Sequence, residues 1–238
     1  MNAPEQMSFI EHLTELRTRL IKAIISISLI FLCLVGFSQE IYTFVAQPVL
    51  QVLPQGVDMI ATDITSTLFA PLKLTFWLAF TLAAPFILHQ AWSFISPGLY
   101  QHEKKIAIPL LCSSVILFYA GIGFAYTIVL PILVSFFAAV GPTGVEFMPD
   151  IQHYLNMVIK LFFGFGIAFE IPVALMLIVW SGVLTVSQIK SKRPYVVVGC
   201  FVAAMLLTPP DVFSQTLLAL PMWALFEIGL VMAKYMKL

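Results

Sequence analysis

The chain has 238 residues, of which 61% are hydrophobic and only 10% are charged, with a mean hydropathy of +1.00. A soluble globular domain carries about 25% charged residues, so the deficit indicates an integral membrane protein. The formal net charge is zero, which gives no electrostatic footprint for nucleic-acid binding. The cysteines lie in apolar runs without metal-ligand spacing, so we interpret them as packing residues: Cys33, Cys112 and Cys200.

The segment Ser8–Leu20 predicts an amphipathic helix immediately before the first long apolar run. Ser8 followed by Glu11 matches a capping box, which marks a helix start. Glu15 and Arg19 are four residues apart and can pair on one helix face, which Glu11 shares. An apolar stripe recurs at helical spacing through Phe9, Leu13, Leu16 and Leu20. This segment is typical of a helix that enters the membrane from its surface.

The apolar run Leu20–Phe37 is longer than the core of a secretory signal peptide, and no small-x-small cleavage site follows it. We therefore expect a retained first span. A more polar stretch, Ser38–Thr67, follows and is expected to contain no regular span because of Pro48, Pro54, Gly56, Asp58 and Asp63.

Five further apolar segments follow, and together they predict a single integral membrane domain over residues 1–238 with six transmembrane helices. The second span contains Pro85, the third is over-long, and the sixth is expected to be interrupted at Pro221. The six predicted spans are approximately 20–37, 68–94, 106–140, 155–182, 195–207 and 212–233.

The fifth segment is short, because a helix over 195–207 would extend only about 20 Å against a hydrocarbon core of about 30 Å. Thr208-Pro-Pro-Asp211 then allows only a tight hairpin into the sixth segment. A local thinning of the bilayer and a re-entrant segment both fit this length, and we favour two short spans.

Basic residues indicate the orientation, with both termini in the cytoplasm. Two lysines, Lys73 and Lys160, fall on the other side near the starts of spans, where their long side chains can snorkel. The remaining ten of the twelve basic residues fall on one side: Arg17, Arg19, Lys22, Lys104, Lys105, Lys190, Lys192, Arg193, Lys234 and Lys237.

The sequence argues against an enzyme, because it contains no Gly-x-x-x-x-Gly-Lys-[Ser/Thr], Gly-x-Ser-x-Gly or His-Glu-x-x-His motif. No metal or cofactor is predicted. The four histidines fall in separate segments rather than in one cluster: His12, His89, His102 and His153.

Two carboxylates, Glu15 and Glu103, are predicted to lie at the cytoplasmic edge, where they could bind a pair of guanidinium groups. The alternative is that each forms a solvated surface ion pair, Glu15 with Arg19 and Glu103 with Lys104 or Lys105. Spacing alone favours the ion pairs, which are common and weak.

Glu170 falls in the middle of the fourth span, where a charged group costs about 2.5–3.5 kcal/mol on insertion scales. It should therefore face a wet cavity or a partner, or be protonated; an inter-helix hydrogen bond is an equal alternative. Pro172 is expected to kink this helix. Glu227 is expected to snorkel near the end of the last span.

Four motifs, spread in order over essentially the whole chain, resemble TatC, the multispanning subunit of the twin-arginine protein translocase. No departure from the family pattern is visible at these positions. The motifs are His12-Leu-Thr-Glu-Leu-Arg-Thr-Arg-Leu20, Phe94-x-x-Pro-Gly-Leu99 with Glu103, Phe165-Gly-x-x-Phe-Glu-x-Pro172 and Thr208-Pro-Pro-Asp-x-x-Ser-Gln215.

The resemblance implies a glove-like helical bundle that binds twin-arginine signal peptides of folded cargo, in an oligomeric complex with single-span TatA-like and TatB-like subunits. Export by such complexes draws on the proton-motive force. Glu15 and Glu103 would hold the arginine pair, in a site shaped by Arg17, Phe94, Pro97, Gly98 and Leu99. Glu170 would contact a partner helix in the concave interior, and Pro48 and Asp211 would belong to the extracytoplasmic cap and hairpin.

Two other classes remain open from the residues alone. A small-solute secondary transporter with a midplane acidic site would use Glu170, its only visible polar anchor there. An intramembrane enzyme would need a nucleophile paired with a base, and none is visible.

Overall fold

The computed structural model describes residues 9–53, 58–95, 104–141, 147–209 and 211–236, and over these residues the chain is helical without a named β-strand. The first half consists of α1 (Phe9–Leu34), the 3-10 turn η1 (Val35–Phe37), α2 (Ser38–Leu50), α3 (Ser66–Ile95), α4 (Lys104–Phe124), the π-helical turn η4 (Ala125–Val129) and α5 (Leu130–Val140). The second half consists of α6 (Ile151–Ala168), α7 (Ile171–Trp180), α8 (Val186–Ser191), α9 (Arg193–Leu207) and α10 (Val212–Met236).

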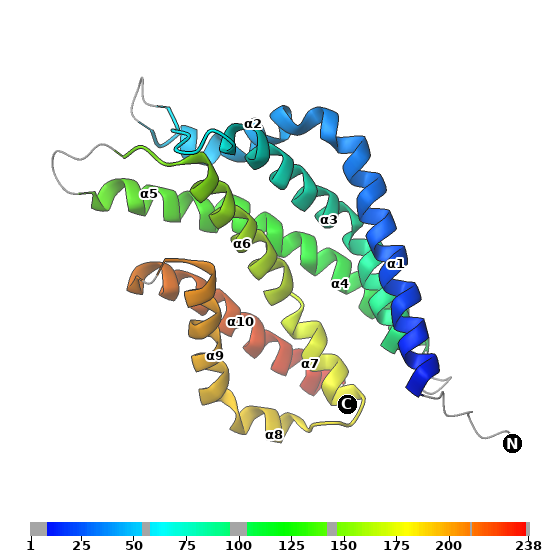
Figure 1. Ribbon diagram of the computed structural model, residues 1–238. Helices are drawn as coiled ribbons and strands as arrows, with labels where there is room; N and C mark the ends of the chain where they lie inside the picture. The colour runs from blue at the N-terminus through cyan, green and yellow to red at the C-terminus, as the bar shows by residue number, and fades with distance from the viewer. Residues whose placement is uncertain (1–8, 54–57, 96–103, 142–146, 210, 237–238) are drawn as a thin grey trace, which may run out of the picture.

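The helices form a bundle in which α1 and α3 pack antiparallel and α6 crosses the middle (Figure 1). The chain bends through η1 into α2 at the end of the bundle opposite to the start of α1 (Figure 1). Helix α10 packs against α7 and α9 and ends near the end of the bundle where α1 begins (Figure 1). Within the described residues, the first and last helical turns therefore lie toward the same end.

Five helical stretches in the described part of the chain are long and apolar enough to cross a membrane. They are Leu13–Leu50, Ser66–Phe94, Ile108–Val140, Ile151–Trp180 and Val212–Tyr235. The all-helical prediction is confirmed. Helix α9 is apolar but shorter, as its sequence predicted, so the count of six crossings remains a prediction.

Two prolines behave differently from the sequence expectation. Residues 38–50 form α2 with Pro48 inside it, so part of the stretch expected to contain no regular span is helical and continues the first long helical stretch. Helix α10 runs through Pro221 without a break, so the predicted interruption is wrong. Proline removes one backbone donor, but apolar helices packed in a bundle tolerate this loss when neighbours support the helix.

The predicted kink near Pro172 is confirmed, because α6 ends at Ala168 and α7 begins at Ile171. Pro172 lacks the N–H that would continue the ladder to the Ala168 carbonyl. The Ala174 N–H still donates to the Glu170 carbonyl at 2.9 Å, so helical bonding resumes at once. The break places Glu170 at a bend rather than inside a regular helix (Figure 1).

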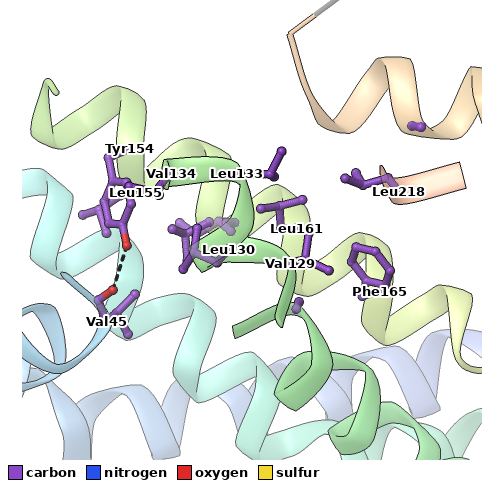
Figure 2. Close-up of a cluster of buried hydrophobic side chains, with 14 of the residues drawn as sticks. Val45, Val129, Leu130, Leu133, Val134, Tyr154, Leu155, Leu161, Phe165 and Leu218 are labelled. Carbon is purple, nitrogen blue, oxygen red and sulfur yellow. Dashed lines mark hydrogen bonds between the residues drawn. The ribbon is translucent and has the colours of Figure 1, made fainter. Parts of the chain in front are cut away.

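The main hydrophobic core surrounds α6 (Figure 2). Leu155, Leu161 and Phe165 of α6 are fully buried against side chains from α5 and α10. The Tyr154 hydroxyl donates a 3.0 Å hydrogen bond to the Val45 carbonyl, which joins α6 to α2 (Figure 2). The neighbouring buried side chains drawn in the figure include Val129, Leu130, Leu133, Val134 and Leu218.

Glycine allows α4 and α6 to approach closely. A Cβ atom at Gly121 would lie 2.5 Å from the Phe165 carbonyl oxygen, a separation that real Cβ atoms do not adopt. A Cβ at Gly166 would lie 2.8 Å from the Phe118 ring. Small residues at such crossings bring helix backbones into contact, which is a main source of helix association in lipid.

We expect Gly121→Ala to lower the stability of the protein by about 1–3 kcal/mol, because the added methyl group forces α4 and α6 apart. The measurement is the thermal unfolding midpoint of the purified protein in detergent.

Gly123→Ala is the matched control, because a Cβ at Gly123 meets no atom within 4 Å. This change should leave stability unchanged or raise it by up to about 1 kcal/mol through helix propensity. Equal midpoints for the two variants would show that the α4–α6 contact does not require glycine.

Candidate functional site

Glu15 lies near the start of α1 and is partly buried, with 21% of its side chain exposed. Its Oε1 atom accepts a 3.0 Å hydrogen bond from Arg19 Nε and a second bond from Arg19 Nη2. The i, i+4 ion pair predicted from the sequence is therefore present.

The Glu15–Arg19 pair also touches α3. Arg19 Nη1 lies 3.5 Å from Gln90 Oε1 on the neighbouring helix. The second carboxylate oxygen, Glu15 Oε2, is buried and accepts no hydrogen bond from any residue that the structure describes. An ionised carboxylate has room for about four hydrogen bonds, so Glu15 retains unused acceptor capacity.

The structure also describes two other residues of the predicted signal-peptide site, Arg17 and Phe94. Arg17 is exposed on α1, and Phe94 is half-buried in the last turn of α3. Glu103, Pro97, Gly98 and Leu99 lie outside the described residues. The predicted meeting of Glu15 with the loop that follows α3 therefore stays a prediction.

Glu170 is half-buried at the α6–α7 bend. Its Oε1 atom is buried and has no hydrogen-bond partner among the described residues. The carboxylate interacts with the hydroxyl of Ser114, a buried residue on α4. Glu170 thus faces α4 and also holds an unused acceptor.

Pro48 and Asp211 lie in two separate connections. Pro48 is half-buried in α2, which crosses the end of the bundle opposite to the start of α1 (Figure 1). Asp211 precedes α10, and its Oδ1 accepts a 2.7 Å hydrogen bond from the Ser214 backbone N–H. This is the geometry of an N-cap, which stabilises the first turn of a helix.

Glu227 forms an ion pair with Arg193 that was not predicted from the sequence. The two residues are 34 positions apart and join α10 to the start of α9. No local spacing rule links residues so far apart, so only the folded structure brings them together.

Asp150 is a second residue whose role was not predicted. Its Oδ1 accepts hydrogen bonds from the Gln152 and His153 backbone N–H groups, both at 2.9 Å, and so caps α6. Its Oδ2 accepts bonds from the Thr62 N–H at 3.0 Å and from the Thr62 hydroxyl at 2.7 Å. Ile60 forms an isolated parallel bridge to Asp150 beside these bonds.

These bonds set the ionisation of Asp150. Burial favours its neutral carboxyl, but hydrogen bonds from the Thr62 hydroxyl and from the backbone N–H groups of His153, Thr62 and Gln152 outweigh this, lowering the pKa from 3.8 to about 2. The capping of α6 by Asp150 has a sequence signal, since Asp150 directly precedes an apolar helical run. The hydrogen bonds from Thr62 to Asp150 have no such signal.

Long apolar helices, few charges and carboxylates held at helix crossings define a helical membrane protein of the multispanning class. The sequence profile of the family described as "TatC: Sec-independent protein translocase protein (TatC)" matches residues 11–221. Curated Sec-independent protein translocase proteins TatC are also similar. The protein from Azotobacter chroococcum mcd 1 is 55% identical over 96% of this chain and 89% of its own length. The protein from Escherichia coli (strain K12) is 51% identical over 99% of this chain and 91% of its own length.

A crystal structure of the twin-arginine translocase receptor TatC has the same fold. It superposes with a TM-score of 0.85 at 38% sequence identity and covers 96% of this chain and 100% of its own. The chain belongs to the TatC family and is a component of the Sec-independent protein translocase. Its expected place in protein transport is confirmed, and the small-solute transporter alternative gains no support.

We expect Asp150→Ala to destabilise the protein by about 2–4 kcal/mol, because it removes the α6 cap and leaves the Thr62 donors unpaired. Because the folded pKa lies below the unfolded value, the stabilisation from ionised Asp150 is complete above about pH 4 and is lost as the pH falls through about 2. Thermal unfolding in detergent between neutral and acidic pH measures both effects.

Asp58→Ala is the control, because it makes the same substitution at an exposed aspartate. We expect a change within about 0.5 kcal/mol at any of these pH values. An Asp150→Ala variant as stable as wild type at neutral pH would contradict the anchoring role.

Proposed function

We propose that this protein is the receptor subunit of a twin-arginine translocase, and that it binds the twin-arginine signal peptides of folded precursor proteins at its cytoplasmic face. Glu15 and Glu103 bind the two arginines, and Arg17, Phe94, Pro97, Gly98 and Leu99 shape the site. The observation that carries this proposal is the Glu15 carboxylate, which is fixed in position by Arg19 and still has a buried, unused oxygen.

Arginine suits this carboxylate better than lysine does. Its planar guanidinium presents donors in a fixed fork that matches a carboxylate, whereas lysine offers a point charge. In the structure Arg19 occupies Oε1, so an incoming arginine either takes Oε2 or displaces Arg19. Both routes keep Glu15 paired throughout, which avoids leaving a partly buried charge alone.

Two arginine contacts give recognition rather than very tight capture. Charge-assisted hydrogen bonds contribute about 1.5–3 kcal/mol each. The apolar segment of the signal peptide must therefore add affinity by lying against the bundle or in the lipid. Apolar side chains suited to this contact are exposed along α1, among them Leu13, Leu16 and Leu20.

The remaining parts of the proposal concern partners and orientation. Single-span TatA-like and TatB-like subunits contact the bundle near Glu170 in an oligomeric complex, and the proton-motive force drives export. Both termini lie in the cytoplasm of a bacterial-type inner membrane. The clustering of basic residues near the ends of α1, α9 and α10 supports this orientation.

We expect the double variant Glu15→Gln, Glu103→Gln to lose about tenfold or more of its crosslinking to a twin-arginine signal peptide, because each lost charge-assisted pair contributes more than about 1.4 kcal/mol. Replacing both peptide arginines by lysine should weaken crosslinking to the wild-type protein in the same way. The measurement is the yield of photo-crosslinked peptide in membrane vesicles.

Glu40→Gln is the matched control, since Glu40 is an exposed carboxylate on α2, away from the start of α1. It should crosslink at the wild-type level. A folded double variant that crosslinks like wild type would remove Glu15 and Glu103 from the site.

We expect Glu170→Ala to reduce crosslinking of a TatA-like or TatB-like helix to α6 while leaving signal-peptide crosslinking unchanged. The reason is that Glu170 offers a polar contact at the α6–α7 bend, far along the chain from Glu15. The Glu15→Gln variant, assayed in parallel, should show the opposite pattern. Unchanged partner crosslinking in Glu170→Ala would return Glu170 to a purely structural inter-helix contact.

A further inference from the structure

A cavity of about 930 Å³ lies between α3, α6 and the end of α9, on the part of α6 that begins at Asp150. Its wall is mainly apolar, as expected for a surface in contact with hydrocarbon. Within this wall lies a group of polar and basic side chains that neither the signal-peptide site nor the Glu170 contact uses. The lining residues on which the inference depends are Lys73, Trp77, His153, Asn156, Lys160 and Leu206.

The polar residues of α6 share one face of the helix. His153, Asn156 and Lys160 are separated by three and four positions, so they stack as one stripe. Lys73 of α3 donates a hydrogen bond to the Asn156 side-chain oxygen, which brings its ammonium to the same stripe. Two lysines from two helices therefore converge on one cavity.

The positive charge of this group is only partly offset by the described part of the chain. Lys160 is exposed to the cavity and forms no ion pair or hydrogen bond with a described residue. Asp150 also lines the cavity, but its oxygens are occupied by Thr62 and by the first turn of α6. The described lining thus carries two cations and one anion, and the oxygens of that anion are already hydrogen-bonded to neutral donors rather than to the lysines.

The lysines lie inside the helices rather than at their ends. Lys160 is about 13 Å along α6 from Ile151, and Lys73 is about 10 Å along α3 from Ser66. An ammonium inside a membrane-crossing helix is unfavourable in hydrocarbon unless it pairs with an anion or snorkels to water. A phosphate drawn into the cavity would supply the anion.

We propose that this cavity binds an anionic phospholipid, with the phosphate held by Lys73 and Lys160 and an acyl chain lying against Trp77 and Leu206. His153 and Asn156 offer further hydrogen-bonding groups on the same face. Charge favours a lipid with a phosphate as the occupant, because two ammonium groups from different helices converge here and form no ion pair with a described residue.

The test places a photoreactive amino acid at Leu206, in the full-length protein reconstituted into phosphatidylcholine vesicles that contain phosphatidylglycerol. We expect phosphatidylglycerol adducts at Leu206 to exceed its share of the vesicle lipid. Lys73→Gln with Lys160→Gln should reduce this adduct about tenfold, because each lysine contributes a charge-assisted bond to phosphate. Lys73→Arg with Lys160→Arg should retain it.

Two comparisons make the result specific, and a single variant covers a failure to fold. The same photoreactive group at Ile116, which is equally exposed at 68% but does not line the cavity, should show no phosphatidylglycerol preference. Lys190→Gln with Lys192→Gln, at the opposite end of α9, should leave the Leu206 adduct unchanged. If Lys73→Gln prevents folding, Lys160→Gln alone gives the answer, since Lys160 has no described partner to lose.

Several outcomes would overturn the proposal. Adducts that follow the bulk lipid ratio at Leu206 would show an apolar surface without phosphate recognition. Loss of the adduct when inorganic phosphate is present during irradiation, without a preference for phosphatidylglycerol, would show a free-phosphate site. Crosslinking at Leu206 to a co-expressed single-span subunit, suppressed by the glutamine variants, would assign the lysines to a carboxylate of a partner protein.

Discussion

The close backbone approach of α4 and α6 is the constraint on which the bundle depends. In lipid the hydrophobic effect does little to bring helices together, so association rests on van der Waals packing and hydrogen bonds. Helix α6 satisfies this by presenting Gly166 to Phe118 while Gly121 of α4 meets the Phe165 carbonyl. Gly164 provides the same clearance for Leu207 of α9. Because α6 contacts α3, α4, α9 and α10, its position fixes the others.

The acidic side chains differ in how much of their hydrogen-bonding capacity the fold uses. Asp150 accepts four bonds and serves the structure alone. Glu227 is paired with Arg193 across two helices. Glu15 and Glu170 each keep a buried oxygen without a described partner. An unsatisfied buried acceptor destabilises a fold unless something else pairs with it, so Glu15 and Glu170 are suited to contacts with another chain, and Asp211 Oδ2 is a third acceptor of this kind.

Local rules predicted much of this structure from the sequence, and distance in sequence explains most of what they missed. Hydropathy located the long apolar helices, helical spacing predicted the Glu15–Arg19 pair, and Pro172 marked the bend in α6–α7. Proline was over-interpreted elsewhere: α2 contains Pro48 and α10 contains Pro221 without a break, because packing in the bundle compensates for a missing donor.

The pairs that could not be predicted join residues far apart in the chain. Arg193 and Glu227 are 34 positions apart, and Lys73 and Asn156 are 83 positions apart. No periodicity relates such residues, since their meeting depends on which helices become neighbours. For the same reason the sequence placed Lys73 and Lys160 near span starts but did not reveal that they line one cavity.

The bond between Thr62 and Asp150 has a consequence for biosynthesis. The two residues are 88 positions apart, and the chain between them includes all of α3, α4 and α5. At about 5–20 residues per second, a ribosome needs about 4–18 s to make that stretch. During this interval Thr62 cannot form its hydrogen bonds to Asp150. The contact between the segment before α3 and the start of α6 therefore forms only after α6 has begun to emerge from the ribosome. The segments before α3 and before α6 must also lie on the same side of the membrane for this hydrogen bond to form. It therefore forms late, and only in a chain whose helices have inserted in the correct orientation.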